Sequence, residues 1–90
     1  MGEIICHNEF TIVGRVSEDI KMINDNSFRA LIMCPNDDNY NDLANMVYVD
    51  FDYRDINLFK RMINQGIAVT GHIKYDNGPI LVCDMYKFIN

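Results

Sequence analysis

Two glycines stand in the middle of segments that otherwise have the sequence of β-strands, Gly14 in IVGRV and Gly71 in VTGHI. Glycine weakens the interior of a strand, so its presence there indicates a bend or the close approach of another backbone. Strands that bend sharply are typical of small closed barrels. The two glycines therefore favour a β-barrel over a flat sheet.

The chain has the size and composition of one such barrel. Its 90 residues, of which 49% are hydrophobic, are expected to form a single domain spanning residues 1–90 with a modest core. No apolar run approaches the ~18–20 residues of a membrane span, and no secretory signal pattern is visible in the first ten residues. We therefore expect a cytoplasmic protein that does not associate with membranes.

Alternating apolar residues predict five strands, and one further segment has the periodicity of a helix. The expected strands lie at residues 10–16, 28–34, 46–53, 67–75 and 80–88. Turn-forming residues at 23–27 join the first two strands into a hairpin, and Asn77-Gly78 joins the last two. Residues 35–45 form a long polar loop between the second and third strands.

The helical segment lies between the third and fourth strands. Its apolar side chains, which fall on one stripe, are Ile56, Phe59, Met62 and Ile63. Asp55 is a good N-cap and Gly66 stands where a left-handed C-terminal residue belongs, so the helix is expected between them. The order β-β-β-α-β-β is that of the five-stranded OB-fold barrel, an all-β fold with one short helix. A sandwich would need more strands, and a ferredoxin-like fold would need two helices.

The cysteines and histidines do not have the spacing of a catalytic or metal site. Cys6, Cys34 and Cys83 fit neither a disulfide framework nor a zinc site, so they are expected to be free thiols that pack as small hydrophobes. His7 and His72 have no companion at ligand or triad spacing. These residues therefore predict neither metal binding nor nucleophilic catalysis.

Two acidic pairs, Asp37-Asp38 and Asp50-x-Asp52, raise the question of a cation site. Asp50 and Asp52 share a strand face and nothing supplies the remaining ligands in an ordered loop, so a solvated acidic patch is the better interpretation. No phosphate-binding glycine loop and no paired-carboxylate signature occurs. We therefore expect a protein that is not an enzyme and that has no catalytic residues, no metal and no cofactor.

Three segments carry a family resemblance. They are NEFTIVGRVSEDI (8–20), FRALIMC (28–34) and MVYVDFDYRDINLFKRMINQGIAVTGHI (46–73). These segments resemble the bacterial single-stranded DNA-binding proteins, which have an OB-fold core. The chain differs from that family in having no tryptophan: Met46 stands where a stacking tryptophan is expected and Asp52 where a phenylalanine is. The resemblance implies a homodimer or homotetramer that acts in DNA replication, recombination or repair beside other replication proteins.

OB folds bind single strands with a positive groove and with aromatic side chains on which bases stack. The residues expected to bind nucleic acid on the matching surface are Arg15, Arg29, Tyr40, Tyr48, Tyr53, Arg54, Lys74 and Tyr75. The 8 basic and 13 acidic residues give a net charge of −5, so a polyanionic ligand requires the basic residues to gather on one face. Two functions stay open: binding of single-stranded DNA or RNA, and an OB-fold interaction module whose acidic surface meets a basic protein.

Overall fold

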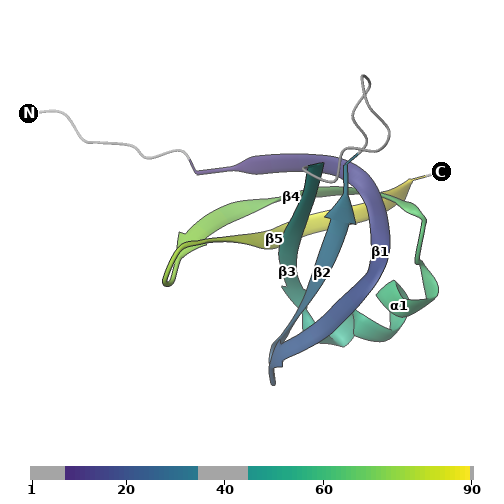
Figure 1. The fold of residues 1–90 in the computed structure, drawn as a ribbon, viewed down its shortest axis with the longest axis horizontal. Helices are drawn as coiled ribbons and strands as arrows, with labels where there is room; N and C mark the ends of the chain where they lie inside the picture. The colour runs from purple at the N-terminus through teal and green to yellow at the C-terminus, as the bar shows by residue number, and fades with distance from the viewer. Residues whose placement is uncertain (1–7, 35–44, 90) are drawn as a thin grey trace, which may run out of the picture.

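Five strands form a closed barrel in the order β1-β2-β3-β5-β4 (Figure 1). The structure is a computed structural model that describes residues 8–34 and 45–89. The strands are β1 (Phe10–Asn24), β2 (Ser27–Met33), β3 (Met46–Asp52), β4 (Gly66–Tyr75) and β5 (Pro79–Ile89). A 3-10 turn, η2 (Tyr53–Asp55), and a helix, α1 (Ile56–Arg61), lie between β3 and β4. The predicted fold class and order of elements are confirmed, whereas most of the polar loop at 35–45 lies outside the described residues.

Strand β1 closes the barrel by pairing with two partners. Its first half is antiparallel to β4 and its second half is antiparallel to β2. Arg15 pairs with Gly66 on β4 and with Met33 on β2, so the strand changes partner there. It curves around the barrel and ends at Asn24, well beyond the alternation that the sequence shows from Phe10 (Figure 1). On the other side, β3 and β5 complete the ring through a short parallel pairing.

The two strand glycines lie where a neighbouring strand comes close to the backbone. A Cβ on Gly14 would overlap the carbonyl oxygen of Met33 and lie 2.9 Å from Cγ2 of Ile32. Gly71 lies at a register shift between β4 and β5, where a Cβ would overlap the carbonyl oxygen of Val82. Neighbouring atoms thus occupy the space that a side chain would need at both positions. The close approach predicted from the sequence is confirmed.

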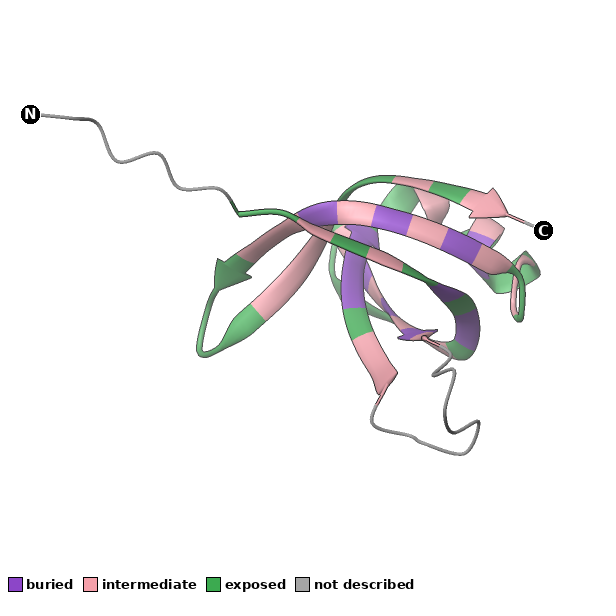
Figure 2. Cartoon of the chain, turned by 90° about the horizontal axis from the view of Figure 1, so that it is seen from above, coloured by how far each residue is buried: buried purple, intermediate pink, exposed green. Residues whose placement is uncertain are grey.

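The core is built from alternate residues of β1 to β4 together with one phenylalanine of α1 (Figure 2). Its buried hydrophobic residues are Val16, Phe28, Ala30, Ile32, Val49, Phe51, Phe59, Ile67 and Val69. The ring of Phe59 lies 4.5 Å from that of Phe51 and 5.1 Å from that of Tyr86, measured between ring centroids. The helix therefore inserts an aromatic side chain into the barrel and holds this end of it closed.

The helix is shorter than the sequence predicts. The capping pattern places it between Asp55 and Gly66, but α1 ends at Arg61. The residue in the left-handed conformation is Asn64, with a φ of 71°, whereas Gly66 begins β4. Gly66 belongs to the barrel and not to the end of the helix, because it pairs with both β1 and β5.

The expected N-cap is also displaced. Asp55 makes no capping hydrogen bond, and its carboxylate acts instead on Tyr86 of β5. Burial, together with this carboxylate, raises the pKa of Tyr86 to about 12. Asp52 caps η2 by accepting the backbone N–H of Arg54 at 3.0 Å. The capping residue is thus Asp52 in place of the predicted Asp55, and a 3-10 turn precedes the helix.

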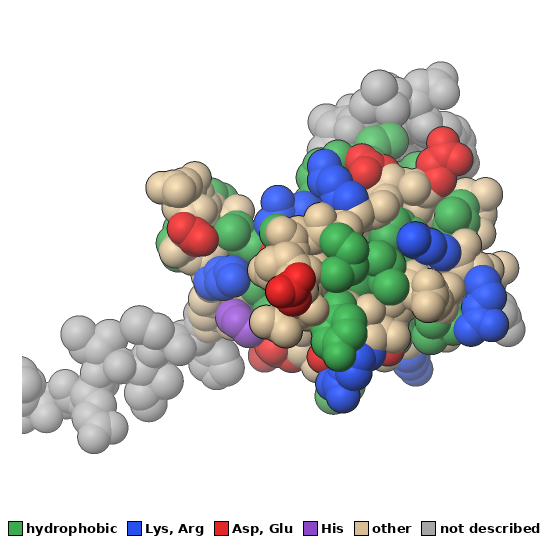
Figure 3. All heavy atoms as spheres, turned by 90° about the horizontal axis from the view of Figure 1, so that it is seen from below, with side chains coloured by type: hydrophobic (Ala, Val, Ile, Leu, Met, Phe, Trp, Pro, Cys, Tyr) green, Lys and Arg blue, Asp and Glu red, His purple; other side chains and the backbone are tan. Residues whose placement is uncertain are grey.

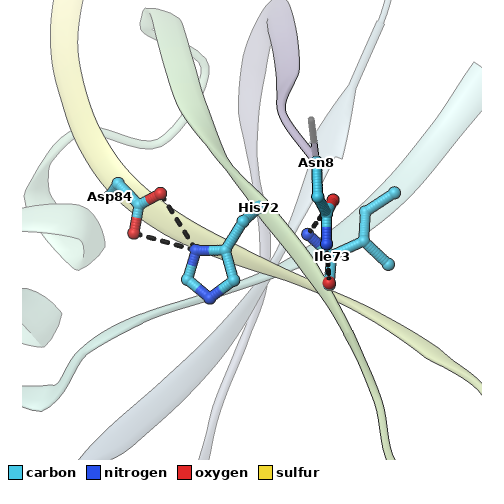
Figure 4. A network of polar contacts seen from close by, with 4 residues as sticks. All are labelled: Asn8, His72, Ile73 and Asp84. Atoms are coloured by element: carbon cyan, nitrogen blue, oxygen red, sulfur yellow. Dashed lines mark hydrogen bonds and ion pairs between the residues drawn. The ribbon is translucent and has the colours of Figure 1, made fainter. Parts of the chain in front are cut away.

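Polar side chains fix the start of β1 against β4. The amide of Asn8 accepts the N–H of Ile73 at 3.0 Å and donates to the carbonyl of the same residue (Figure 4). It thereby continues the β1–β4 ladder beyond its last backbone pair. Beside it, Nδ1 of His72 lies 2.9 Å from the carboxylate of Asp84 on β5 (Figure 4). His72 thus contacts a carboxylate of the neighbouring strand.

The β4–β5 turn has the predicted form. Asn77 and Gly78 both have positive φ, 58° and 130°, as an Asn-Gly hairpin requires. Of the cysteines, Cys34 and Cys83 are half-buried free thiols as expected, whereas Cys6 and His7 lie outside the described residues. Burial raises the pKa of Cys83 to about 11, so this thiol stays protonated near neutrality.

Neither a membrane-spanning helix nor a metal cluster occurs in the described part of the chain. Its helix is too short and too polar to cross a bilayer. Within residues 8–34 and 45–89, no three His, Cys, Asp or Glu side chains converge as metal ligands would.

Candidate nucleic-acid interface

The outer face of β2 and β3 presents an aromatic ring, a guanidinium and two carboxylates. Arg29 on β2 pairs in register with Asp50 on β3, and Leu31 pairs with Tyr48. Because side chains alternate along a strand, these four point away from the core that the residues between them fill. Asp52 ends the same row on β3.

A hollow of about 210 Å³ lies between this face and the start of β5. Its lining residues are Arg29, Tyr48, Pro79, Ile80 and Leu81, and we call it the Tyr48 slot. Tyr48 is 43% exposed, so its ring is accessible from solvent. An open slot with an aromatic ring, an apolar wall and a polar group suits a flat, partly apolar heterocycle.

Two side chains of β1 hold the ring of Tyr48 in place. Its hydroxyl donates to Oδ2 of Asp19 at 2.6 Å, and this hydrogen bond to a carboxylate raises the pKa of Tyr48. Nζ of Lys21 lies 5.4 Å from the ring centroid, within the range of a cation–π interaction. The ring is therefore oriented before any ligand binds, which reduces the entropy lost on stacking.

Arg29 is bound by Asp50. Nε donates to Oδ1 at 2.6 Å and Nη2 donates to Oδ2 at 3.1 Å. This hydrogen-bonded carboxylate raises the pKa of Arg29, and Asp50 itself is only 8% exposed. The prediction that Asp50 belongs to a solvated acidic patch is therefore wrong, because the strand register places its carboxylate against a guanidinium.

A second pair repeats this arrangement at the surface. Nη2 of Arg54 lies 2.9 Å from Oδ2 of Asp52. The guanidinium lowers the pKa of Asp52. Both arginines of the predicted site next to β3 thus have their charge compensated, and the acidic residues that compensate them belong to β3 itself.

Lys74 and Tyr75 extend the candidate interface along the β4–β5 hairpin. Lys74 borders a second hollow, of about 240 Å³, that also includes Asp50 and Asp52. Tyr75 is 78% exposed and follows Lys74 on β4. Lys74 pairs in register with Ile80, which lines the Tyr48 slot, so it adds a cation beside the slot.

The remaining predicted residues lie at the edges or elsewhere. Tyr53 and Arg54 follow β3, and the N–H of Tyr53 donates to the carbonyl of Asn26 in the β1–β2 turn at 3.1 Å. Arg15 borders a hollow between β1, β4 and the end of β5, away from the Tyr48 slot. Tyr40 lies outside the described residues.

Comparison with known proteins gives a fold but no family. No family model matches the chain, and no curated protein does. Among solved structures it is similar to the dimeric N-terminal domain of the PriB protein from Thermoanaerobacter tencongensis, with a TM-score of 0.70 and 12% sequence identity. The match covers 92% of this chain and 97% of that one. The chain has an OB fold.

The β2–β3 surface is the one on which OB folds commonly bind their ligands. Barrels of this kind bind oligonucleotides and oligosaccharides on strands 2 and 3, between the β1–β2 and β4–β5 loops. The Tyr48 slot occupies this position, since β3 supplies its ring and the start of β5 supplies its wall. The geometry thus brings together Arg29 and Tyr48, with Lys74 and Tyr75 nearby, and separates them from Arg15.

Sequence reasoning missed Asp19 and Lys21 on β1 and the role of Asp50. The β1–β2 register shifts between Val16 and Ile20, so the alternation that starts at Phe10 cannot be continued past the bulge. The side chains of Asp19 and Lys21 therefore had no predictable direction. The role of Asp50 could have been found, because Asp50 shares the outer face of β3 with Tyr48.

Basic residues do not form a uniform patch on the face drawn in Figure 3. Lysine and arginine side chains lie around an apolar area, and acidic side chains lie among them. With a net charge of −5 for the chain, this face offers no uniform positive surface to a polyanion.

Proposed function

We propose that this OB-fold chain is a non-catalytic protein that binds single-stranded DNA in replication, recombination or repair, as bacterial single-stranded DNA-binding proteins do. The Tyr48 slot carries the proposal, because it places an exposed and oriented ring on the surface that OB folds use for oligonucleotides. Stacking on an aromatic side chain contributes about 1–3 kcal/mol per base and tolerates any sequence, since every base has a π face.

Stacking supplies more of the affinity than charge does. Arg29 and Arg54 are both paired with aspartates, so phosphates must compete for them. We expect about two to three phosphates neutralised per protomer, which corresponds to a logarithmic salt slope of about −1.5 to −2 for a single strand. Fluorescence polarisation with labelled poly-dT over a salt series measures this slope.

The same titration tests the function. Poly-dT is expected to bind at low salt and duplex DNA of equal length far more weakly, because the bases of a duplex are already stacked on one another. A labelled poly-U strand distinguishes DNA from RNA. Absence of poly-dT binding at low salt, or equal binding of duplex and single strand, would contradict the proposal.

A second candidate is an OB-fold module that binds a protein in a replication complex. The observation in its favour is a hollow of about 420 Å³ at the other end of the β2–β3 face. Leu31, Met33 and Met46 line it, and Glu18 and Asp19 also border it. A basic, partly apolar protein segment would suit that chemistry. This function replaces the first if poly-dT does not bind.

We also propose that the protein is a homo-oligomer, a dimer or a tetramer, formed through the outer face of β1, β4 and β5. Val13 is 55% exposed and Met85 is 72% exposed on this face. In register they lie beside Ala68 and Thr70, two small residues that line a hollow of about 280 Å³ together with Met85. A small domain gains stability by covering such a surface, and the similar PriB domain is dimeric.

Sedimentation velocity at micromolar concentration is expected to show a species of two or four 10.5 kDa protomers. The double variant Val13→Glu/Met85→Glu should shift this species to the monomer, because it places charges in the proposed contact. Met22→Glu/Ile23→Glu is the control, since it changes two exposed apolar residues at the β1–β2 hairpin instead. A parent protein that stays monomeric at all concentrations would refute the oligomer.

A further inference from the structure

We propose that the Tyr48 slot selects guanine, so that one position of a bound single strand is read by base identity. The inference rests on the proposed function and adds a specificity to it. Its basis is the Arg29–Asp50 pair: Arg29 lines the slot beside Tyr48, and Asp50 holds Arg29 from outside the slot.

Asp50 occupies only one edge of the Arg29 guanidinium. Its two oxygens accept hydrogen bonds from Nε and Nη2. An arginine side chain has five N–H donors in one plane, so three remain, two on Nη1 and one on Nη2. The nitrogens Nη1 and Nη2 form the end of the group, where two parallel N–H donors face outward as a fork.

The pairing also fixes this fork in space. Arg29 and Asp50 face each other in the β2–β3 ladder, and the Asp50 side chain is only 11% exposed. The Arg29 side chain remains 30% exposed and borders the slot, so a ligand can reach it. A guanidinium held in this way loses little freedom when it forms further hydrogen bonds.

Guanine is the base that matches the fork. It presents the acceptors N7 and O6 side by side, and a bidentate arginine contact to them is the commonest specific base contact. Adenine replaces the second acceptor with an amino donor, and thymine and cytosine have no N7. Tyr48 would therefore supply affinity for any base, whereas Arg29 would discriminate among them.

Arg54 and Asp52 provide a matched control within the same protein. They form the same type of ion pair, at 2.9 Å, next to the same strand. Arg54 is 75% exposed, however, and it does not line the Tyr48 slot. Changing Arg54 should therefore alter charge near the interface without altering base preference.

The experiment compares labelled oligothymidylates of ~12 nucleotides, within the site sizes of OB folds, that differ only at one central base. The central base is dT, dA, dG or 7-deaza-dG, which lacks N7. In fluorescence polarisation the dG strand should bind about five- to thirty-fold more tightly than the dT and dA strands, in the range of one bidentate base contact. The 7-deaza-dG strand should lose most of this advantage.

Three variants then assign the preference to residues. Arg29→Lys keeps the charge but lacks the fork, so the ratio of dG to dT affinity should fall to about one. Asp50→Asn removes a negative charge and loosens the fork, so dT binding should strengthen while the ratio falls. Arg54→Lys should leave the ratio unchanged. A purely electrostatic role of Asp50 would instead shift all four strands together.

Each outcome bears on the inference. If all strands bind with affinities within about two-fold of each other, far below the value of a bidentate contact, guanine selection is refuted and the proposed function stands. If none of the labelled DNA strands binds, both the guanine selection and the proposed function are refuted. The 7-deaza-dG comparison needs no variant, so it still decides whether N7 is read if Arg29→Lys does not fold. A preference that survives in a folded Arg29→Lys protein would also refute the role of the fork.

Discussion

Replacing Gly71 by valine is expected to lower the free energy of unfolding by about 3 kcal/mol or more, a large loss for a single substitution. A Cβ at this position would overlap the carbonyl oxygen of Val82 and lie 2.8 Å from its carbonyl carbon. It would also lie 2.9 Å from Cε2 of Phe10. The backbone of β5 cannot move away without breaking the β4–β5 ladder, so relieving the overlap would itself cost stability.

Urea unfolding of the purified variant measures this loss. Thr70→Val is the matched control, because it puts the same side chain on the adjacent residue of β4, where a side chain already exists, and should change stability by less than about 1 kcal/mol. Gly14→Val should also be destabilising, since its Cβ would meet Met33 and Ile32. A change below about 0.5 kcal/mol at Gly71 would show that the strands can separate freely there.

The fold was predictable because its determinants are local. Gly14 and Gly71 mark close approaches within segments of clear alternation, and Asn77-Gly78 is a strong signal for a hairpin turn. The helix ends were not predictable, because long-range contacts override the capping pattern. The carboxylate of Asp55 acts on Tyr86 of β5, more than 30 positions away, and Gly66 pairs with β5 as the first residue of β4.

The candidate site was predictable only where local strand alternation determines the direction of its side chains. Tyr48 follows from strict alternation along β3, and Arg29 follows from that along β2. The neighbours that orient Tyr48 do not follow, because a bulge in β1 separates Asp19 and Lys21 from the readable pattern. The sequence predicts Arg15 as part of the site, but β1 changes partner at that residue, which lies beside a different hollow.

Replacing Tyr48 by alanine is expected to weaken poly-dT binding by about 1–3 kcal/mol, or roughly five- to 150-fold in Kd. The substitution removes the exposed ring of the slot but takes nothing from the core, so the free energy of unfolding should change little. Fluorescence polarisation at fixed low salt measures the affinity, and urea unfolding checks that the variant is folded.

Tyr48→Phe separates the ring from the hydroxyl. It keeps the stacking surface but loses the hydrogen bond to Asp19, so binding should stay within about three-fold of the parent. If phenylalanine weakens binding as much as alanine does, the hydroxyl and Asp19 matter more than stacking. If alanine binds as well as the parent, the ring does not contact the strand. Only retention by phenylalanine together with loss by alanine identifies Tyr48 as a surface on which a base stacks, because phenylalanine and alanine both lack the hydroxyl and differ in the ring.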